Sequence, residues 1–256
     1  MYHLKLLILK ILIFISTLSR GHGESYPKIS EKISYSQTDA IVEDIPHFLD
    51  FVSQHSKLPC YVVCHSWGGI ILNSYLSRFP NAIPSIKAIV CFGSKRNVTA
   101  TNLHALFFAK IIWNRVSFLI TKAFGYMPGR LLRFGSDDDT KEWHADSVKW
   151  VTAYADWIDT NDNFDYGKAC TKVTLPPTLY FAAEKDYALG HKIDVQKFMK
   201  ESHPNESLSN NERYKYVLLS KKNNFKHDYD HINMLTHKDA QIDQFPLVLK
   251  WLEKWK

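Results

Sequence analysis

The stretch that most constrains this chain is Tyr61–Gly69, which reads YVVCHSWGG. A short continuous apolar run is typical of a strand that is buried on both faces of a parallel sheet. The run ends at Ser66, and the segment that follows the two glycines has helical spacing of apolar residues until Pro80. The sequence therefore predicts a buried strand, a tight turn that carries Ser66, and a helix.

Similar apolar runs recur along the chain, and segments with helical spacing separate them. The other predicted strands are Leu12–Leu18, Ile86–Ser94, Pro177–Asp186 and Tyr214–Ser220. The other predicted helices are Gln37–Gln54, with a kink at Pro46, Lys192–Ser202 and Gln241–Lys254. Strands that alternate with helices predict an α/β fold built on a parallel sheet.

The alternation stops between Lys95 and Thr174. This segment has no strand signals, and it is helical and rich in aromatic residues. An acidic stretch, SDDDT, interrupts it and is expected to be a solvated loop. We therefore expect a first core segment of residues 1–94, a helical insertion of residues 95–174, and a second core segment of residues 175–256.

The composition is that of an ordinary globular protein and excludes one class of partner. The chain has 256 residues, of which 45% are hydrophobic and 23% are charged, and its net charge is +6. The basic residues are scattered, so we expect no nucleic-acid partner. The four cysteines, Cys60, Cys64, Cys91 and Cys170, have no paired metal spacing and are expected to be buried free thiols in a reducing compartment.

The start of the chain allows two interpretations. Leu4–Leu18 follows a basic start and is apolar, as in a signal peptide or a membrane anchor. Lys10 interrupts the run, which is short for a membrane span. We favour a buried strand over Leu12–Leu18 and a cytoplasmic protein; the alternative is a protein that contacts the membrane through Leu4–Leu18.

The position of Ser66 suits a nucleophile. In parallel α/β sheets, ligands bind beyond the carboxyl ends of the strands, where Ser66 is predicted to lie. A sharp turn of this kind requires small residues two positions before and after the serine, and here these are Cys64 and Gly68. The amide of Trp67, at the start of the helix, would donate a hydrogen bond to a developing oxyanion.

A serine hydroxyl needs a base to take its proton, and the base needs an acid to orient it. Asp186 lies just past one predicted strand, and His231 lies in the loop after the next, so both are expected at the same sheet edge as Ser66. His231 is favoured because the apolar run INML that follows it can anchor the loop. The alternatives are Glu184 and Asp194 for the acid, and His227 and His237 for the base.

The histidines His227 and His231 are four residues apart, a spacing that also occurs in metal sites. No third ligand of known spacing accompanies them. We therefore expect no metal and no organic cofactor.

Four stretches in the order RGHGES, CHSWGG, AAEKD and YDHINML resemble motifs of the α/β-hydrolase superfamily. The likeness is closest to members with a helical cap, such as serine esterases, monoglyceride lipases and related peptidases. The resemblance implies that Ser66 is the nucleophile, Asp186 the acid and His231 the base, and that residues 95–174 form the cap. It also implies cleavage of an ester-type bond of a small substrate with an apolar acyl group, through an acyl-enzyme.

The chain also departs from the pattern of that superfamily. It reads C-x-S-x-G where G-x-S-x-G is usual, and the strands and the oxyanion loop that precede RGHGES in the superfamily are not found in it. We therefore expect a hydrolase that lacks its N-terminal strands. The alternative is a truncated or degenerate hydrolase-like protein without catalytic activity.

Overall fold

The computed structural model describes residues 19–30, 32–103, 107, 112–113, 115–132, 137–207, 209 and 211–256. The predicted strand over Leu12–Leu18 and the alternative membrane contact through Leu4–Leu18 both lie outside these residues. Within the described ranges, no helix combines the length and the apolar character needed to cross a membrane.

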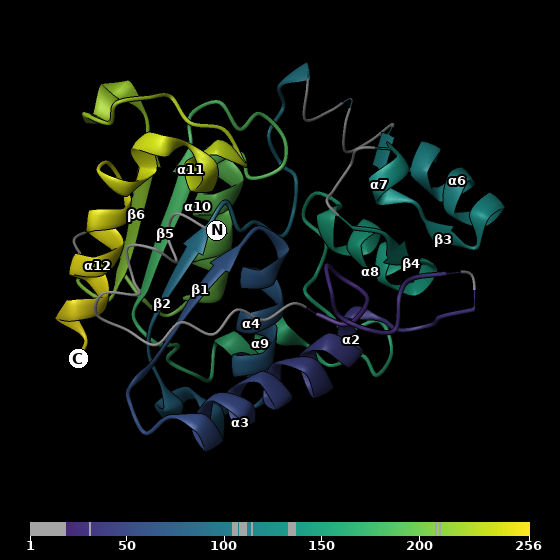
Figure 1. Ribbon diagram of the computed structural model, residues 1–256, viewed down its shortest axis with the longest axis horizontal. Coiled ribbons are helices and arrows are strands. Elements are labelled where there is room, and N and C mark those ends of the chain that lie inside the picture. Colours follow the sequence, from purple (N-terminus) through teal and green to yellow (C-terminus); the bar gives the residue numbers. More distant parts are fainter. Residues whose placement is uncertain are drawn as a thin grey trace.

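The described residues contain a main sheet of four parallel strands (Figure 1). In spatial order these are β1 (Cys60–His65), β2 (Ile86–Phe92), β5 (Thr178–Ala183) and β6 (Tyr214–Leu219). The predicted α/β fold is confirmed, and these strands fall on four of the predicted apolar runs. The register pairs His65 with Phe92, and Phe92 with Phe181, so the strands end side by side at one edge.

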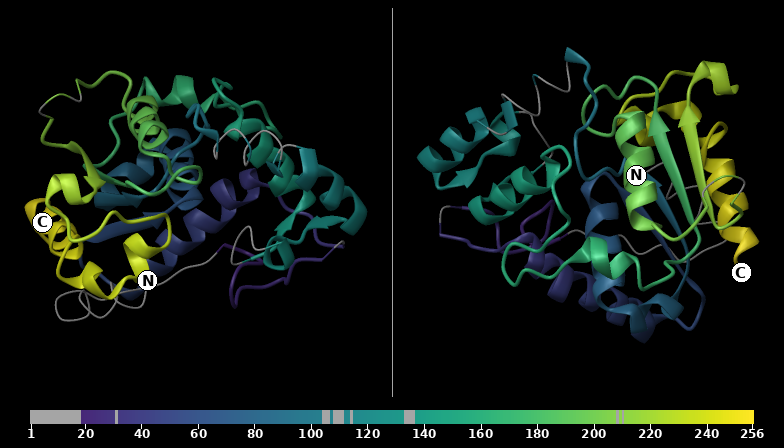
Figure 2. Two further views of the ribbon diagram at one scale, coloured as in Figure 1. Left: turned by 90° about the horizontal axis from the view of Figure 1, so that it is seen from above. Right: turned by 180° about the vertical axis from the view of Figure 1, so that it is seen from behind.

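Helices cover both faces of this sheet. Along β2, Ile89 and Cys91 join one buried hydrophobic cluster, and Val90 and Phe92 join another, because successive side chains of a strand point to opposite faces. The first cluster packs against α4 (Trp67–Arg78) and α10 (Lys192–Ser202), and the second against α12 (Phe245–Lys254). Figure 2 shows α10 and α12 on opposite sides of the sheet.

The helix α10 illustrates how local sequence determines an element. The side chains of Val195, Phe198 and Met199 are buried and are spaced three and four residues apart, which places them on one face of the helix. The helix has the bounds that this spacing predicts. The predicted helix Gln37–Gln54 forms in three successive parts, α2 (Gln37–Asp39), a π-helical turn η1 (Ala40–Asp44) and α3 (Ile45–His55), and Pro46 lies at the start of α3.

The remaining elements connect or flank these strands and helices. They are η2 (Pro80–Ser85), α6 (Ser117–Phe124), β3 (Tyr126–Met127), α7 (Gly129–Leu132), β4 (Asp139–Thr140), α8 (Lys141–Val151), α9 (Tyr166–Cys170), η4 (Lys221–Asn223), α11 (Asn233–Thr236) and η5 (Lys238–Gln241). The helices α6 and α7 and the strands β3 and β4 lie to one side of the main sheet (Figure 1). By contrast, Trp150 of α8 and Tyr166 of α9 join the buried cluster that contains α4.

Two expectations for residues 95–174 are wrong. The segment is not free of strands, because β3 and β4 pair as a short antiparallel ladder. The acidic stretch is not a simple solvated loop, since the amide of Gly23 donates to Asp137 at 2.8 Å and His22 Nε2 lies 3.1 Å from Asp139 Oδ1. These contacts join residues more than a hundred positions apart, so local patterns do not reveal them.

Candidate active site

Ser66 lies in a strained turn between β1 and α4. Its backbone φ is 51°, in the left-handed region that side chains other than glycine rarely adopt. Its amide donates to the carbonyl of Phe92 at 2.8 Å, which extends the β1–β2 ladder up to the turn. Such strain costs of order 1–3 kcal/mol and is concentrated at functional sites. The turn fixes Ser66 at the carboxyl end of β1, where the sequence predicts it.

The crowding around this turn differs from the prediction. A Cβ atom added to Gly68 would meet only Cys64 Cβ, at 3.9 Å, which is an ordinary contact. A Cβ atom on Gly69 would come within 2.7 Å of Ser94 Cβ and would also meet its hydroxyl. The expectation that space restricts position 68 is therefore wrong, because the first turn of α4 packs on β2 through Gly69.

Asp186 and His231 form a buried pair. The Nδ1 atom of His231 lies 2.6 Å from Asp186 Oδ2, and the two residues are 7% and 4% exposed. Burial alone would raise the pKa of Asp186, but the hydrogen bond and the charge of His231 outweigh it, and the pKa is lowered. The amide of Leu189 donates to the other carboxylate oxygen at 2.9 Å. An ionised carboxylate at this position orients the imidazole with Nδ1–H towards it and leaves Nε2 for other partners.

The alternative acids and bases contact other groups. Glu184 pairs with Lys192, and Asp194 accepts from the amide of Thr99 at 2.9 Å. The histidines His227 and His237 lie against Asp239 rather than Asp186.

Gly93 explains how His231 reaches this position. It follows β2 directly, has a φ of 60°, and a Cβ atom placed on it would come within 2.9 Å of His231 Nδ1 and 2.7 Å of Met234 Cε. Only glycine combines this backbone conformation with such a close approach. Because Ser66 bonds to Phe92 and Gly93 touches His231, the serine turn and the histidine loop meet at adjacent strand ends.

His65 is a residue of this site that the sequence argument missed. Its Nε2 donates to the backbone carbonyl of His231 at 3.0 Å, and the two rings are 4.7 Å apart. Burial, together with the nearby His231, lowers the pKa of His65 to about 4, so the ring is neutral at pH 7. Its place directly before Ser66 is the one signal in the sequence that could have indicated this contact.

The hydroxyl of Ser66 itself makes no hydrogen bond to His231 within the described part of the chain. Hydrogen bonds between a nucleophile and its base are often long before substrate binds, so this arrangement is compatible with catalysis. Trp67 begins α4, and its amide is among the helical N–H groups without a partner in the helix. Its indole donates to Gln37 at 3.0 Å.

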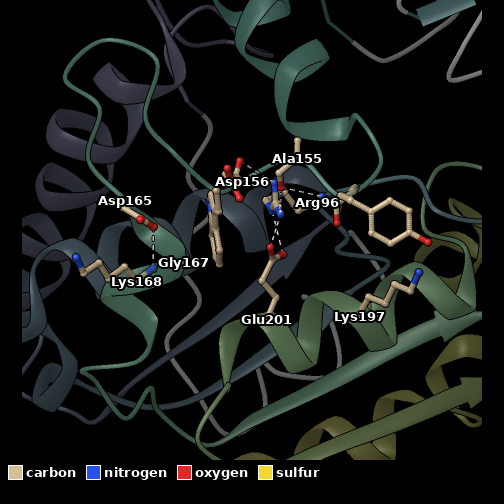
Figure 3. A pocket seen from close by; sticks show the side chains of 11 residues that line it. Arg96, Ala155, Asp156, Asp165, Gly167, Lys168, Lys197 and Glu201 are labelled. Atoms are coloured by element: carbon tan, nitrogen blue, oxygen red, sulfur yellow. Dashed lines mark hydrogen bonds and ion pairs between the residues drawn. The ribbon is translucent and has the colours of Figure 1, made fainter.

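A cavity of about 510 Å³ lies elsewhere, between the residues after β2 and the helix α10 (Figure 3). It is lined by none of Ser66, Asp186 and His231. Arg96 and Glu201 point towards each other in it, with Arg96 Nε 2.9 Å from Glu201 Oε2. Arg96 also donates to the carbonyl of Ala155 at 2.7 Å. This guanidinium is engaged by the protein, so the cavity gives no argument for a substrate site.

Solved structures share the fold. An esterase from Thermogutta terrifontis matches with a TM-score of 0.54 and 11% identity, over 92% of this chain and 77% of that one. A monoacylglycerol lipase from Paleococcus ferrophilus matches with a TM-score of 0.52 and 12% identity, over 93% of this chain and 81% of that one. At such low identity, the likeness shows the fold alone.

The family described as serine aminopeptidase, S33, matches residues 19–143. This match covers 125 of the 256 residues, and the fold is that of α/β-hydrolase structures. The matched segment includes Ser66 and ends before Asp186 and His231. A comparison with curated proteins found no match.

Proposed function

We propose that this protein cleaves an ester-type bond through an acyl-enzyme on Ser66. The observation that carries the proposal is the buried 2.6 Å hydrogen bond between His231 and Asp186, beside the strained turn of Ser66. A histidine oriented in this way is the base that a serine nucleophile requires.

In the proposed reaction, Ser66 Oγ attacks the carbonyl carbon of the substrate while His231 Nε2 takes the hydroxyl proton. The Trp67 amide donates to the developing oxyanion, and Asp186 stabilises the imidazolium that forms. The imidazolium then protonates the leaving alcohol, and the C–O bond to that alcohol breaks. His231 then takes a proton from water, which attacks the acyl carbon. The imidazolium returns this proton to Ser66 Oγ as the bond between Oγ and the acyl carbon breaks, and the carboxylic acid is released. These steps use no metal and no organic cofactor.

We propose a small substrate with an apolar acyl group, and a cap formed by residues 95–174. A pair of aromatic side chains supports this proposal. The ring of Trp150 in α8 lies 6.3 Å from the ring of Trp67, the residue next to the proposed nucleophile. An esterase and a monoacylglycerol lipase are among the proteins that share the fold. We further propose a reducing, cytoplasmic location, since Cys64 and Cys91 are paired across β1 and β2 and remain free thiols.

The test is the hydrolysis of p-nitrophenyl acetate, butyrate and octanoate by the purified chain and by Ser66→Ala. We expect turnover by the wild type, with an initial burst of p-nitrophenol if deacylation is the slower step, and none above background by the variant. Equal rates for both proteins would overturn the proposal. Circular dichroism and a thermal melt of the variant check that it is folded.

The second candidate is a hydrolase-like protein without catalytic activity. The observation that favours it is the missing hydrogen bond between Ser66 and His231 among the described residues. A folded wild type that hydrolyses none of the three esters, and that also fails to react with a fluorophosphonate, would favour this candidate.

A further inference from the structure

A second group of side chains lies close to His231 along the chain, on either side of α11. His227, His237 and Asp239 each offer a ligand atom, and these atoms all lie within 4.8 Å of one another. His227 Nε2 is 2.7 Å from Asp239 Oδ2, and His237 Nδ1 is 3.9 Å from the same oxygen. The two imidazole rings are 4.3 Å apart.

We propose that His227, His237 and Asp239 bind a divalent transition metal ion such as Zn²⁺. Two imidazoles and a carboxylate are ligands that Zn²⁺ takes in tetrahedral sites, with bonds of about 2.0–2.2 Å. Bonds of that length place ligand atoms roughly 3.3 Å apart. The two measured separations from Asp239 Oδ2, 2.7 and 3.9 Å, lie on either side of this value, so small side-chain movements complete the site.

The placement and exposure of these side chains favour an ion. His227 Nε2 and Asp239 Oδ2 already face each other at 2.7 Å. The side chains of His227, His237 and Asp239 are 39%, 30% and 26% exposed, which leaves room for water as the fourth ligand. His237 Nδ1 also accepts from the amide of Asp239 at 3.1 Å, a bond that an ion at this nitrogen would replace.

This site differs from the pair that the sequence suggested. His231, four residues from His227, faces Asp186 and cannot join it. The third ligand, Asp239, lies twelve residues from His227 and is brought close by the fold. An ion here would tie His227 to His237 and so close the segment that carries His231. Tyr229 packs on both rings, at 5.6 and 5.9 Å, and holds them in place within that segment.

The experiment is a titration of the chelator-treated full chain with ZnCl₂, followed by calorimetry and by thermal melting. We expect one strong site and a rise in Tm of roughly 5–10 °C at a hundredfold excess over Kd. The variants His227→Ala and Asp239→Asn should weaken binding by more than the roughly 10–100-fold that loss of a mere supporting residue costs. His47→Ala removes an exposed histidine of α3 and is the matched control, with unchanged affinity.

Equal Zn²⁺ affinity in wild type, His227→Ala and Asp239→Asn would overturn the site, as would equal effects of Mg²⁺ and Zn²⁺ on Tm. Because both variants change partly exposed residues, circular dichroism should show them folded. The binding result does not depend on the proposed hydrolase activity. The effect on His231 does rest on that activity, and it predicts a Zn²⁺-dependent change in the rate of ester hydrolysis that His227→Ala abolishes.

Discussion

Two histidines that lie four residues apart in this protein each pair with an aspartate, at nearly equal distances. His231 is 2.6 Å from Asp186, and His227 is 2.7 Å from Asp239. The first pair is almost fully buried at the carboxyl edge of the sheet, whereas the second is about one-third exposed at the surface. The distance between two partners therefore says little about what the pair does.

Burial decides the difference. A buried pair is held in one geometry by the packed residues around it, and its interactions are strong in a medium of low polarity. A surface pair is screened by water and salt and contributes little to stability. The buried pair suits the orientation of a base, while the exposed pair is free to exchange its hydrogen bond for a metal ion.

The largest expected difference between the pairs is in catalysis. We expect His231→Gln to lower kcat/KM for ester hydrolysis by at least about 10³-fold, because the base is lost. His227→Gln in metal-free buffer should change it by less than roughly twofold, since that ring contacts neither Ser66 nor Asp186. Steady-state kinetics give kcat/KM for both variants. Comparable losses in the two would contradict the claim that only the buried pair takes part in ester hydrolysis.

The buried pair also depends on a close backbone approach. Gly93→Ala should destabilise the protein by about 2–4 kcal/mol, because the added methyl meets His231 and Met234 and the backbone has a φ of 60°. Gly167→Ala in α9 is the matched control, since its nearest new contact is at 3.5 Å, and we expect a change within about 1 kcal/mol. Urea unfolding measures the free energy of unfolding of both variants. If Gly93→Ala were as stable as the wild type, the close approach of His231 to Gly93 would be contradicted.

The environment of the buried pair should make stability depend on pH. The pKa of His65 is lowered to about 4 in the folded state from 6.5, so the unfolded chain binds the proton more readily. Stability therefore falls as pH decreases from about 6.5 towards about 4, by roughly 1–3 kcal/mol from this residue. Urea unfolding between pH 7 and pH 4.5 should show that the free energy of unfolding depends less on pH in His65→Gln than in the wild type. If the free energy of unfolding changed with pH equally in both proteins, His65 would not contribute to the pH dependence of stability.

Loss of the exposed pair should have the smallest effect on the thermal stability of the protein. In metal-free buffer, Asp239→Asn should change Tm only slightly, and less at high salt than at low salt, because salt screens surface charges. Asp186→Asn should lower Tm strongly and independently of salt, since it disturbs a buried interaction. Thermal melts at two salt concentrations compare the variants, and a large salt-independent loss in Asp239→Asn would mean that the second pair is structural.

Local patterns in the sequence predicted the parts of the fold that depend on local spacing. The helix α10 and the four strands of the main sheet follow apolar runs and periodicity, and Ser66, Asp186 and His231 follow from their places after strands. The contacts of His65 with His231 and of Asp137 with Gly23 were missed, because each joins residues over a hundred positions apart. The group of His227, His237 and Asp239 was missed because His237 and Asp239 lie ten and twelve residues from His227, a spacing that no local pattern marks as a ligand set.

Reaction with a fluorophosphonate shows whether the buried pair of His231 and Asp186 activates Ser66. The probe loses fluoride only to an activated serine, and mass spectrometry of the digested protein identifies the modified residue. We predict modification of Ser66 in the wild type and in His227→Gln, and loss of reaction in Ser66→Ala and in Asp186→Asn. Modification of a different residue, or an undiminished reaction in Asp186→Asn, would show that the buried pair does not activate Ser66.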